Sequence, residues 1–157
     1  MSRRDLVEAT LGEAEEARAL LYAGFYDYAR NAGREEPGPY ETLEALILAR
    51  NVYFWRGRTG IVVFDKGTRE GRLMLALFCL HPDYHRSGLG ADMMADAVCL
   101  ATERGFSELE LYTREIFAHL RRFYEGQGFI LERTGPHLTK PDGNNRIFMV
   151  KPLRHDP

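Results

Sequence analysis

The sequence predicts an α+β fold in which a mixed, mostly antiparallel sheet of about seven strands is flanked by about four helices. Two observations carry this prediction. Three strand-like segments follow one another between Val52 and Leu80 with only short turns between them, which is typical of an antiparallel meander. After Leu80, helical and strand-like patterns alternate, and a strand–helix–strand order with short links indicates a parallel pair. The 157 residues contain no internal repeat and no change in composition, so we expect a single domain over residues 1–157.

Composition and charge argue against several classes of protein. The net charge is only −2 and the isoelectric point is near 6.2, so we expect no nucleic-acid partner. Asp92 and Asp96 interrupt the most apolar region, and no stretch of about 18 apolar residues remains that would span a membrane. The chain starts Met-Ser-Arg-Arg-Asp, which lacks the apolar segment of a secretion signal. These features predict a cytoplasmic protein with no membrane partner.

Residues 1–50 predict a short strand and two helices. Asp5–Thr10 has the pattern of a strand, and Thr10 or Gly12 then caps a helix that ends near residues 31–33. A loop rich in Pro and Gly follows, and a second helix is expected at Glu41–Arg50. The long helix carries one apolar stripe, which predicts a face packed in the core. Its members are Ala14, Ala17, Leu20, Leu21, Gly24, Phe25 and Tyr28.

The hydrophobic period changes to two at Val52, which predicts strands. Val52–Arg56 and Ile61–Asp65 are joined by a turn that contains glycine, and a second turn leads to Leu73–Leu80. This third strand is apolar on both faces, so we expect it at the centre of a sheet that is covered on both sides. Helices are then expected at residues 89–104 and 116–124, strands at 108–112, 129–132 and 146–151, and a long loop at 134–145.

The stretch Leu73–Ala101 contains the strongest functional signal. A strand passes through a Gly-rich turn into the first turn of a helix, which directs several backbone N–H groups at one place. The helix dipole favours negative charge at the same place, so the pattern predicts a site for a phosphate or pyrophosphate. Two cysteines, Cys79 and Cys99, lie in apolar surroundings here, which indicates reduced core thiols rather than a disulfide.

Gly88-Leu89-Gly90 alone is a weak signal, because Gly-x-Gly occurs at many turns. A P-loop requires a Lys after its last glycine, and none follows here. A dinucleotide fingerprint requires a third glycine, where this chain has Met93. It also requires an acid at the end of the next strand, whereas Glu108 and Glu110 lie at the start and middle of that strand. The pattern therefore fits neither kind of nucleotide site.

The motif instead resembles the signature of the GNAT superfamily of acetyl-CoA-dependent N-acetyltransferases. In that family, a strand ends in an apolar-x-Pro-x-Tyr corner. A six-residue pattern follows, in which the first residue is Arg or Gln, the fourth is Gly and the sixth is Gly or Ala. Here the corner is Leu80-His81-Pro82-Asp83-Tyr84, and His85-Arg-Ser-Gly-Leu-Gly-Ala91 follows it, with His85 in place of the first Arg or Gln. The resemblance covers about residues 52–151 and implies the GNAT fold.

Acetyl-CoA is the co-substrate that this resemblance implies. The backbone N–H groups of the Gly-rich turn would hold its pyrophosphate, and the end of the preceding strand would pair with its pantetheine arm like an additional strand. Backbone N–H groups at that strand end would also polarise the thioester carbonyl. The implied cofactor-binding residues are Phe78, Cys79, Leu80, His85, Arg86, Ser87, Gly88, Leu89, Gly90 and Ala91.

A second motif, Tyr124-Glu-Gly-Gln-Gly-Phe129, matches Tyr-x-x-x-Gly-Phe of the same family. The family's tyrosine protonates the leaving CoA thiolate, so the resemblance implies that Tyr124 is the general acid; a phenol with a pKa of about 10 is suited to this role. The alternative is that Tyr124 only extends the apolar stripe of Phe117 and Phe123. Phe117 stands where many relatives carry Asn.

The sequence identifies no general base and predicts no metal site. Leu73–Leu80 contains no carboxylate, whereas many relatives carry a Glu on this strand. His81 and His85 have the spacing of metal ligands, but Pro82 prevents a helix there. Ordered water would serve in place of a base, and the side-chain candidates are Glu110, His81, His119, Tyr53 and Tyr112.

The acceptor is expected to be a small-molecule or peptide amine, held by the first two helices and the 134–145 loop. Residues 1–50 contain ten acids and six arginines, a local balance of −4, which favours a cationic acceptor. A solvated helix face explains the same charges equally well. The resemblance also implies a homodimer. The alternative function, from another class, is a non-catalytic acyl-CoA-binding module that senses or scaffolds.

Overall fold

The computed structural model describes residues 5–154. Residues 1–4, on which the expectation about a secretion signal partly depends, lie outside the described part of the chain. Among the helices of the described part, none is long and apolar enough to cross a membrane. The elements are β1 (Leu6–Glu8), α1 (Ala14–Asn31), α2 (Leu43–Leu48), β2 (Val52–Trp55), β3 (Gly60–Lys66), β4 (Arg72–Leu80), α3 (Leu89–Glu103), β5 (Glu108–Arg114), α4 (Ala118–Gly126), β6 (Ile130–Gly135) and β7 (Arg146–Pro152).

The strands follow the order β1-β2-β3-β4-β5-β7-β6 in one seven-stranded sheet. β1 and β2, β2 and β3, β5 and β7, and β6 and β7 pair antiparallel, whereas β4 and β5 pair parallel from Arg72 opposite Glu108. The predicted α+β fold with a mixed sheet is confirmed, including the parallel pair on either side of α3 and the central place of β4.

Several element bounds differ from the prediction by a few residues, and two of these differences have a clear physical reason. The second helix is shorter than Glu41–Arg50, because Arg50 adopts a left-handed backbone with φ of 63° and Tyr40 one with φ of 51°. The loop expected at 134–145 starts later, because Thr134 pairs with Ile147 and extends β6. Cross-strand pairing of this kind depends on a partner that is distant in sequence, so local composition does not reveal it.

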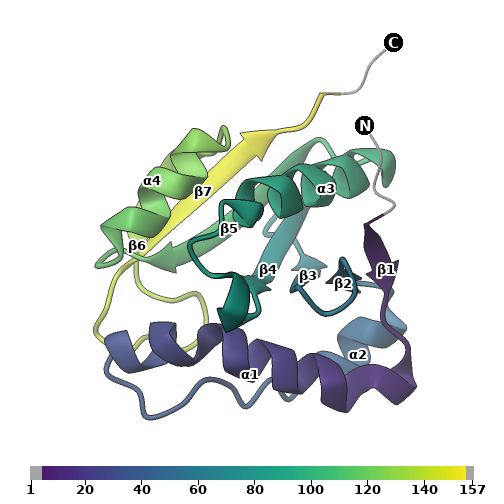
Figure 1. Cartoon of the computed structure of the whole chain (residues 1–157). Coiled ribbons are helices and arrows are strands. Elements are labelled where there is room, and N and C mark those ends of the chain that lie inside the picture. The colour runs from purple at the N-terminus through teal and green to yellow at the C-terminus, as the bar shows by residue number, and fades with distance from the viewer. Residues whose placement is uncertain (1–4, 155–157) are drawn as a thin grey trace. The chain divides into compact units, whose positions relative to one another are not determined.

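The chain consists of two compact units. The first includes residues 5–65 and 77–99, and the second includes residues 66–76 and 100–154. A single domain over the whole chain stays a prediction. In the first unit, α1 and α3 lie on opposite faces of β2 and β3 (Figure 1). The predicted apolar stripe of α1 supplies part of the core of this unit, which contains Ala9, Ala14, Ala17, Leu20, Leu21, Leu43, Ile47, Val52, Phe54, Ile61, Val63 and Cys79.

Two glycines allow helices to approach the strands of the first unit closely. A Cβ atom on Gly24 of α1 would lie 2.5 Å from Cys79 Sγ, and a Cβ atom on Gly60 of β3 would lie 2.5 Å from Met93 Sδ. On the α3 side, the buried indole of Trp55 donates a hydrogen bond from Nε1 to Asp96 Oδ2 at 2.8 Å. These contacts hold α1 against the end of β4 and fix α3 on β2 and β3.

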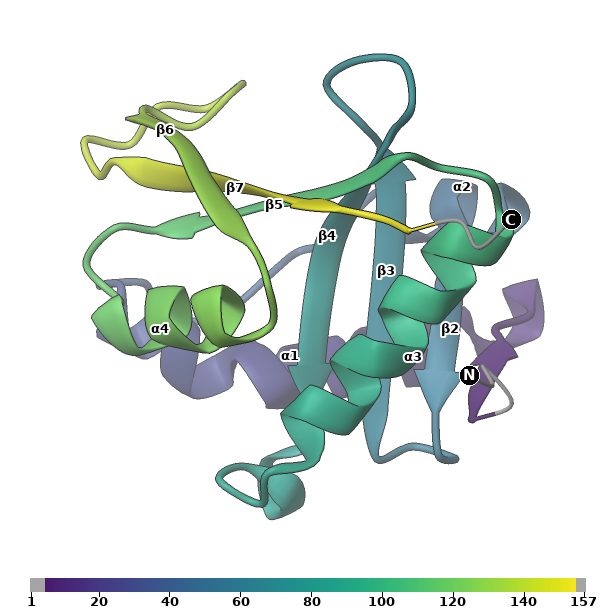
Figure 2. The ribbon, with the colours of Figure 1, turned by 90° about the horizontal axis from the view of Figure 1, so that it is seen from above.

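In the second unit, α4 lies along one face of β5, β7 and β6 (Figure 2). A buried arginine, Arg72 of β4, organises the charged residues of this unit. Its side chain is only 3% exposed, and it donates to Glu108 at 2.9 Å, to Glu110 at 3.1 Å and to Glu132 at 2.8 Å. Glu110 also accepts hydrogen bonds from the N–H and hydroxyl groups of Thr68. The β3–β4 turn, β5 and β6 are thereby joined through one guanidinium group.

We expect Arg72→Met to lower the free energy of unfolding by about 3–5 kcal/mol, because it leaves the buried carboxylate of Glu110 without its cation. Chemical denaturation measures the change. Arg69→Met is the matched control: Arg69 pairs with the same Glu132 at 2.8 Å but is 62% exposed. Its removal is expected to cost less than about 1 kcal/mol. Equal effects of the two substitutions would contradict this assignment.

Candidate functional site

The loop between β4 and α3 forms a sharp corner that is held by its own hydrogen bonds. The Pro82–Tyr84 segment forms one turn of 3₁₀ helix, in which the N–H of Tyr84 donates to the His81 carbonyl at 2.9 Å. The N–H of His81 donates to the Thr59 carbonyl at 2.8 Å, which ties the corner to the β2–β3 turn. Ser87 then donates its hydroxyl proton to the Tyr84 carbonyl and accepts the N–H of Leu89 at 3.2 Å.

Beyond this corner, the backbone turns left-handed twice before α3 begins. Arg86 has φ of 61° and Gly88 has φ of 83°, and a Cβ atom on Gly88 would have no neighbour within 4 Å. Residues 85–88 are exposed. The first N–H groups of an α-helix have no carbonyl partner within the helix. The N–H groups at the start of α3 therefore add to the backbone N–H groups of the preceding turn. The result is a set of backbone donors at the positive end of a helix, open to an anion.

The three residues at the end of β4 that the resemblance implicates lie beside α1 and the corner. Cys79 is buried, and Phe78 and Leu80 are half-buried. The Leu80 carbonyl accepts a hydrogen bond from His85 Nε2 at 2.9 Å, so the His85 ring closes the loop back on the strand. Burial raises the pKa of the Cys79 thiol, which keeps it protonated and fits a core thiol. Neither Cys79 nor Cys99 forms a disulfide.

Tyr124 belongs to the second unit, on the last turn of α4. Its ring packs edge to face against Phe123 at 5.4 Å and against Phe129 at 5.9 Å between ring centroids. Its carbonyl accepts the N–H of Phe129 at 3.0 Å. Gly128 allows the chain to reverse there with φ of 92°. The Tyr-x-x-x-Gly-Phe motif therefore forms a helix end in which the tyrosine is fixed by two aromatic neighbours and remains half-buried.

A family model described as "Acetyltransferase (GNAT) family" matches residues 25–129, a span that contains the corner, the Gly-rich turn and Tyr124. The chain belongs to the GNAT acetyltransferase family. Among curated proteins, no sequence matches the chain.

Solved structures of GNAT proteins resemble the chain over most of its length. Ard1 from Thermoplasma volcanium matches with a TM-score of 0.70 and 19% identity, covering 96% of this chain and 97% of that one. The PaiA N-acetyltransferase from Thermoplasma acidophilum, solved in complex with coenzyme A, matches with a TM-score of 0.61 and 16% identity, covering 94% and 97%. Nourseothricin acetyltransferase has 26% identity and a TM-score of 0.55, covering 66% of this chain and 64% of its own. The GNAT fold is therefore confirmed.

Most candidate bases suggested by the sequence are engaged in other contacts. Glu110 is bound by Arg72 and Thr68, and the Tyr53 hydroxyl donates to the Arg50 carbonyl at 2.7 Å. His81 Nδ1 accepts the N–H of Asp83 at 3.1 Å. Among residues 5–154, no three His, Cys, Asp or Glu side chains gather in the manner of metal ligands. Glu110, Tyr53 and His81 therefore each make hydrogen bonds within the protein.

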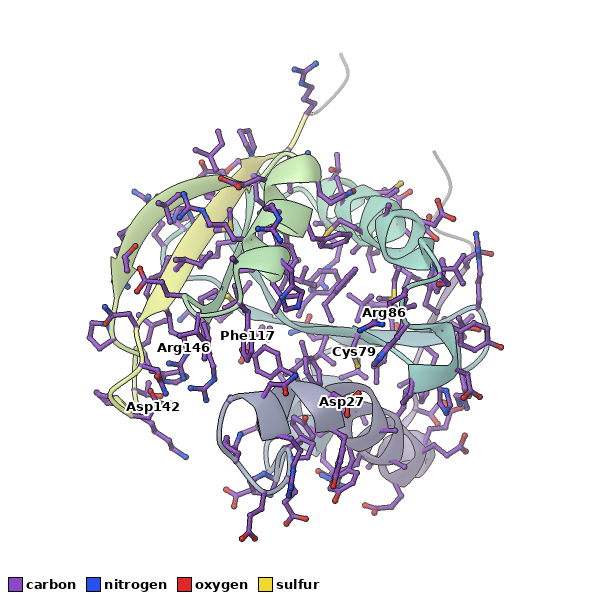
Figure 3. The ribbon with its side chains drawn as sticks, turned by 60° about the vertical axis from the view of Figure 1, so that its left-hand side comes forward. Asp27, Cys79, Arg86, Phe117, Asp142 and Arg146 are labelled. Atoms are coloured by element: carbon purple, nitrogen blue, oxygen red, sulfur yellow. The ribbon has the colours of Figure 1, made fainter. Side chains whose placement is uncertain are left out.

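A cluster in the β6–β7 region of the second unit did not emerge from the sequence. Asp142 accepts hydrogen bonds from the guanidinium groups of Arg114 at 2.9 Å and Arg146 at 3.0 Å. Figure 3 shows Asp142 and Arg146 near each other. Both arginines are buried, and the hydrogen bonds from Arg146 hold the pKa of Asp142 well below its usual range. Nearby in the sequence, His137 Nε2 lies 3.2 Å from the Tyr112 hydroxyl. His137 and Asp142 lie in the loop between β6 and β7, and Arg146 directly follows this loop. Because a loop has no hydrophobic period, the sequence pattern does not reveal these residues.

The hydrogen bonds and burial of His137 predict that the stability of this protein depends on pH. Its Nδ1 accepts the N–H groups of Lys140 at 3.0 Å and Thr139 at 3.2 Å, which requires the ring to be unprotonated at that atom. Burial, assisted by the nearby Arg146, lowers the pKa of His137 below its ordinary value of 6.5. The folded state therefore binds this proton more weakly than the unfolded state, and stability that is present above pH 6.5 is lost as the pH falls below it.

We expect the free energy of unfolding to decrease between pH 7.5 and pH 5.5, a range above the titration of ordinary carboxyl groups at about pH 4. His137→Asn keeps a side-chain acceptor for the loop but does not titrate, so this variant should show a smaller decrease. Chemical denaturation of both proteins at the two pH values measures the difference. Identical decreases would show that His137 is not responsible.

Proposed function

We propose that this protein is an acetyl-CoA-dependent N-acetyltransferase that acetylates a primary amine by direct attack, with Tyr124 as the general acid. The acceptor is a small-molecule or peptide amine, and the protein acts in the cytoplasm as a single domain, as a homodimer, without a metal, nucleic-acid or membrane partner. Membership of the GNAT acetyltransferase family and the coenzyme A named in a similar structure support the choice of co-substrate.

The observation that carries this proposal is the open backbone turn before α3. The left-handed φ of 83° at Gly88 and the free space around this residue allow a bulky anion to approach the peptide N–H groups. The proposed contacts for the pyrophosphate are the backbone of His85, Arg86, Ser87, Gly88, Leu89, Gly90 and Ala91. Arg86 adds a positive charge to this turn.

The end of β4 is proposed to bind the pantetheine arm through the backbone of Phe78, Cys79 and Leu80. A peptide N–H there would donate to the thioester carbonyl oxygen and stabilise the charge that develops on it. The amine nitrogen forms a bond to the carbonyl carbon while the carbon–sulfur bond breaks. Tyr124 gives its phenolic proton to the departing thiolate, and the surplus proton on nitrogen passes to water. The phenolate regains a proton from solvent.

A panel of primary amines, assayed for free CoA released from acetyl-CoA, tests this function. The panel contains alkylamines, polyamines, aminoglycosides and a Lys-bearing peptide. CoA release that depends on one of these amines, with the acetylated amine identified by mass spectrometry, is the expected result. Tight acetyl-CoA binding by calorimetry with no acetylated product from any amine would favour the non-catalytic acyl-CoA-binding module instead.

A further inference from the structure

Asp27 lies on α1 at the edge of the apolar stripe, next to Tyr28. It follows Gly24 by three positions and Leu20 by seven, which places all three on one face of the helix. Leu20 and Gly24 are buried on that face, whereas Asp27 is exposed. Along this line of the helix, burial ends at Gly24, and a carboxylate is exposed to solvent one turn later.

In the described part of the chain, Asp27 differs from the two other acids within α1, Glu15 and Glu16, in having no side-chain partner. Glu15 pairs with Arg18 at 2.6 Å, and Glu16 pairs with Arg58 at 2.9 Å. Within residues 5–154, no hydrogen bond or ion pair engages the side chain of Asp27. Its charge is therefore available to a cation from outside the protein.

The close approach at Gly24 brings this part of α1 beside the end of β4. A Cβ atom on Gly24 would lie 2.5 Å from Cys79 Sγ and 2.9 Å from the Leu80 carbonyl oxygen. Asp27 is three residues further along the helix, an axial rise of about 4.5 Å. Figure 3 shows Asp27 on α1 and Cys79 on the neighbouring strand within the first unit. Asp27 thus lies about one helical turn beyond the residue of α1 that approaches the strand end proposed to hold the thioester.

We propose that Asp27 binds the cationic amine acceptor, receiving its ammonium group beside the end of β4. This inference rests on the proposed N-acetyltransfer and names its acceptor class, an amine that is protonated at neutral pH.

The chemistry of the transfer explains why a carboxylate is useful there. The ammonium must lose one proton to water before its lone pair can attack, and the nitrogen becomes positively charged again as its bond to the carbonyl carbon forms. A carboxylate close to that nitrogen stabilises both charged forms. The proton that the nitrogen finally loses goes to solvent, so Asp27 takes no part in the proton transfer.

Asp27→Asn tests the proposal in the full-length protein, with Asp27→Glu as the conservative variant. The assay is CoA release with the best amine of the panel at saturating acetyl-CoA, together with calorimetric titration of acetyl-CoA. We expect Asp27→Asn to raise KM for the amine about 10–100-fold, the range for loss of a charged hydrogen bond. The affinity for acetyl-CoA should not change, and Asp27→Glu should restore part of the loss.

Glu70→Gln is the matched control, because it removes one exposed acid from the β3–β4 turn and should leave every parameter unchanged. An unchanged KM in Asp27→Asn, with amine acetylation intact in the unmodified protein, would overturn the role of Asp27 and leave the proposed function standing. Loss of acetyl-CoA affinity or of the folded state in this variant would also overturn it, by showing a structural role. If the unmodified protein binds acetyl-CoA but acetylates no amine, both proposals fail.

Discussion

Tyr124→Phe is expected to lower kcat for amine acetylation by about 10²–10⁴-fold, the usual contribution of a positioned general acid. The substitution removes only the hydroxyl group, and the ring can keep its contacts at 5.4 Å to Phe123 and 5.9 Å to Phe129. Acetyl-CoA affinity and the free energy of unfolding should therefore stay close to those of the unmodified protein. Steady-state kinetics, calorimetry and chemical denaturation measure the three quantities.

The pattern of these three measurements distinguishes the catalytic role of Tyr124 from a packing role. A packing role predicts that Tyr124→Phe has nearly unmodified turnover, whereas Tyr124→Ala loses stability. The catalytic role predicts that both variants lose turnover and that Tyr124→Phe alone keeps its stability. An unchanged kcat in Tyr124→Phe, with an amine that the unmodified protein acetylates, would rule out the phenol as the acid.

Gly88→Glu is expected to abolish measurable binding of acetyl-CoA. The new side chain would occupy the open space before α3 and bring a negative charge to the place proposed for the pyrophosphate. The left-handed φ of 83° adds backbone strain of about 1 kcal/mol in any non-Gly residue. Isothermal titration calorimetry with acetyl-CoA measures the loss.

Gly57→Glu is the control that distinguishes loss of the binding site in Gly88→Glu from the effect of backbone strain. Gly57 lies in the β2–β3 turn with φ of 68°, and a Cβ atom there would also have no neighbour within 4 Å. The same change at this position should cost similar stability but leave acetyl-CoA binding intact. Retained affinity in Gly88→Glu, or an equal loss in both variants, would contradict the assignment of the α3 turn.

Hydrophobic spacing was sufficient to predict the elements of this fold because each pattern reflects burial on one face. The apolar stripe of α1 is buried through Ala17, Leu20 and Leu21, and β4 occupies the centre of the strand order, as its two apolar faces predicted. The parallel pairing of β4 and β5 followed from the helix between them. Helix and strand ends were less accurate where left-handed residues such as Arg50 or distant strand partners decide them.

The sequence by itself determined which turn belongs to the GNAT signature, because the glycines and the Pro-Tyr corner impose a backbone shape through local sterics alone. Only the tertiary structure decided what the charged side chains do. Arg72 is the centre of a buried network of ion pairs, and Glu110 is bound within this network. Asp27, in contrast, has no side-chain partner among the described residues and lies at the edge of the core. These outcomes depend on which residues distant in the chain come within hydrogen-bond distance, and on how far water is excluded around them, which no local pattern encodes.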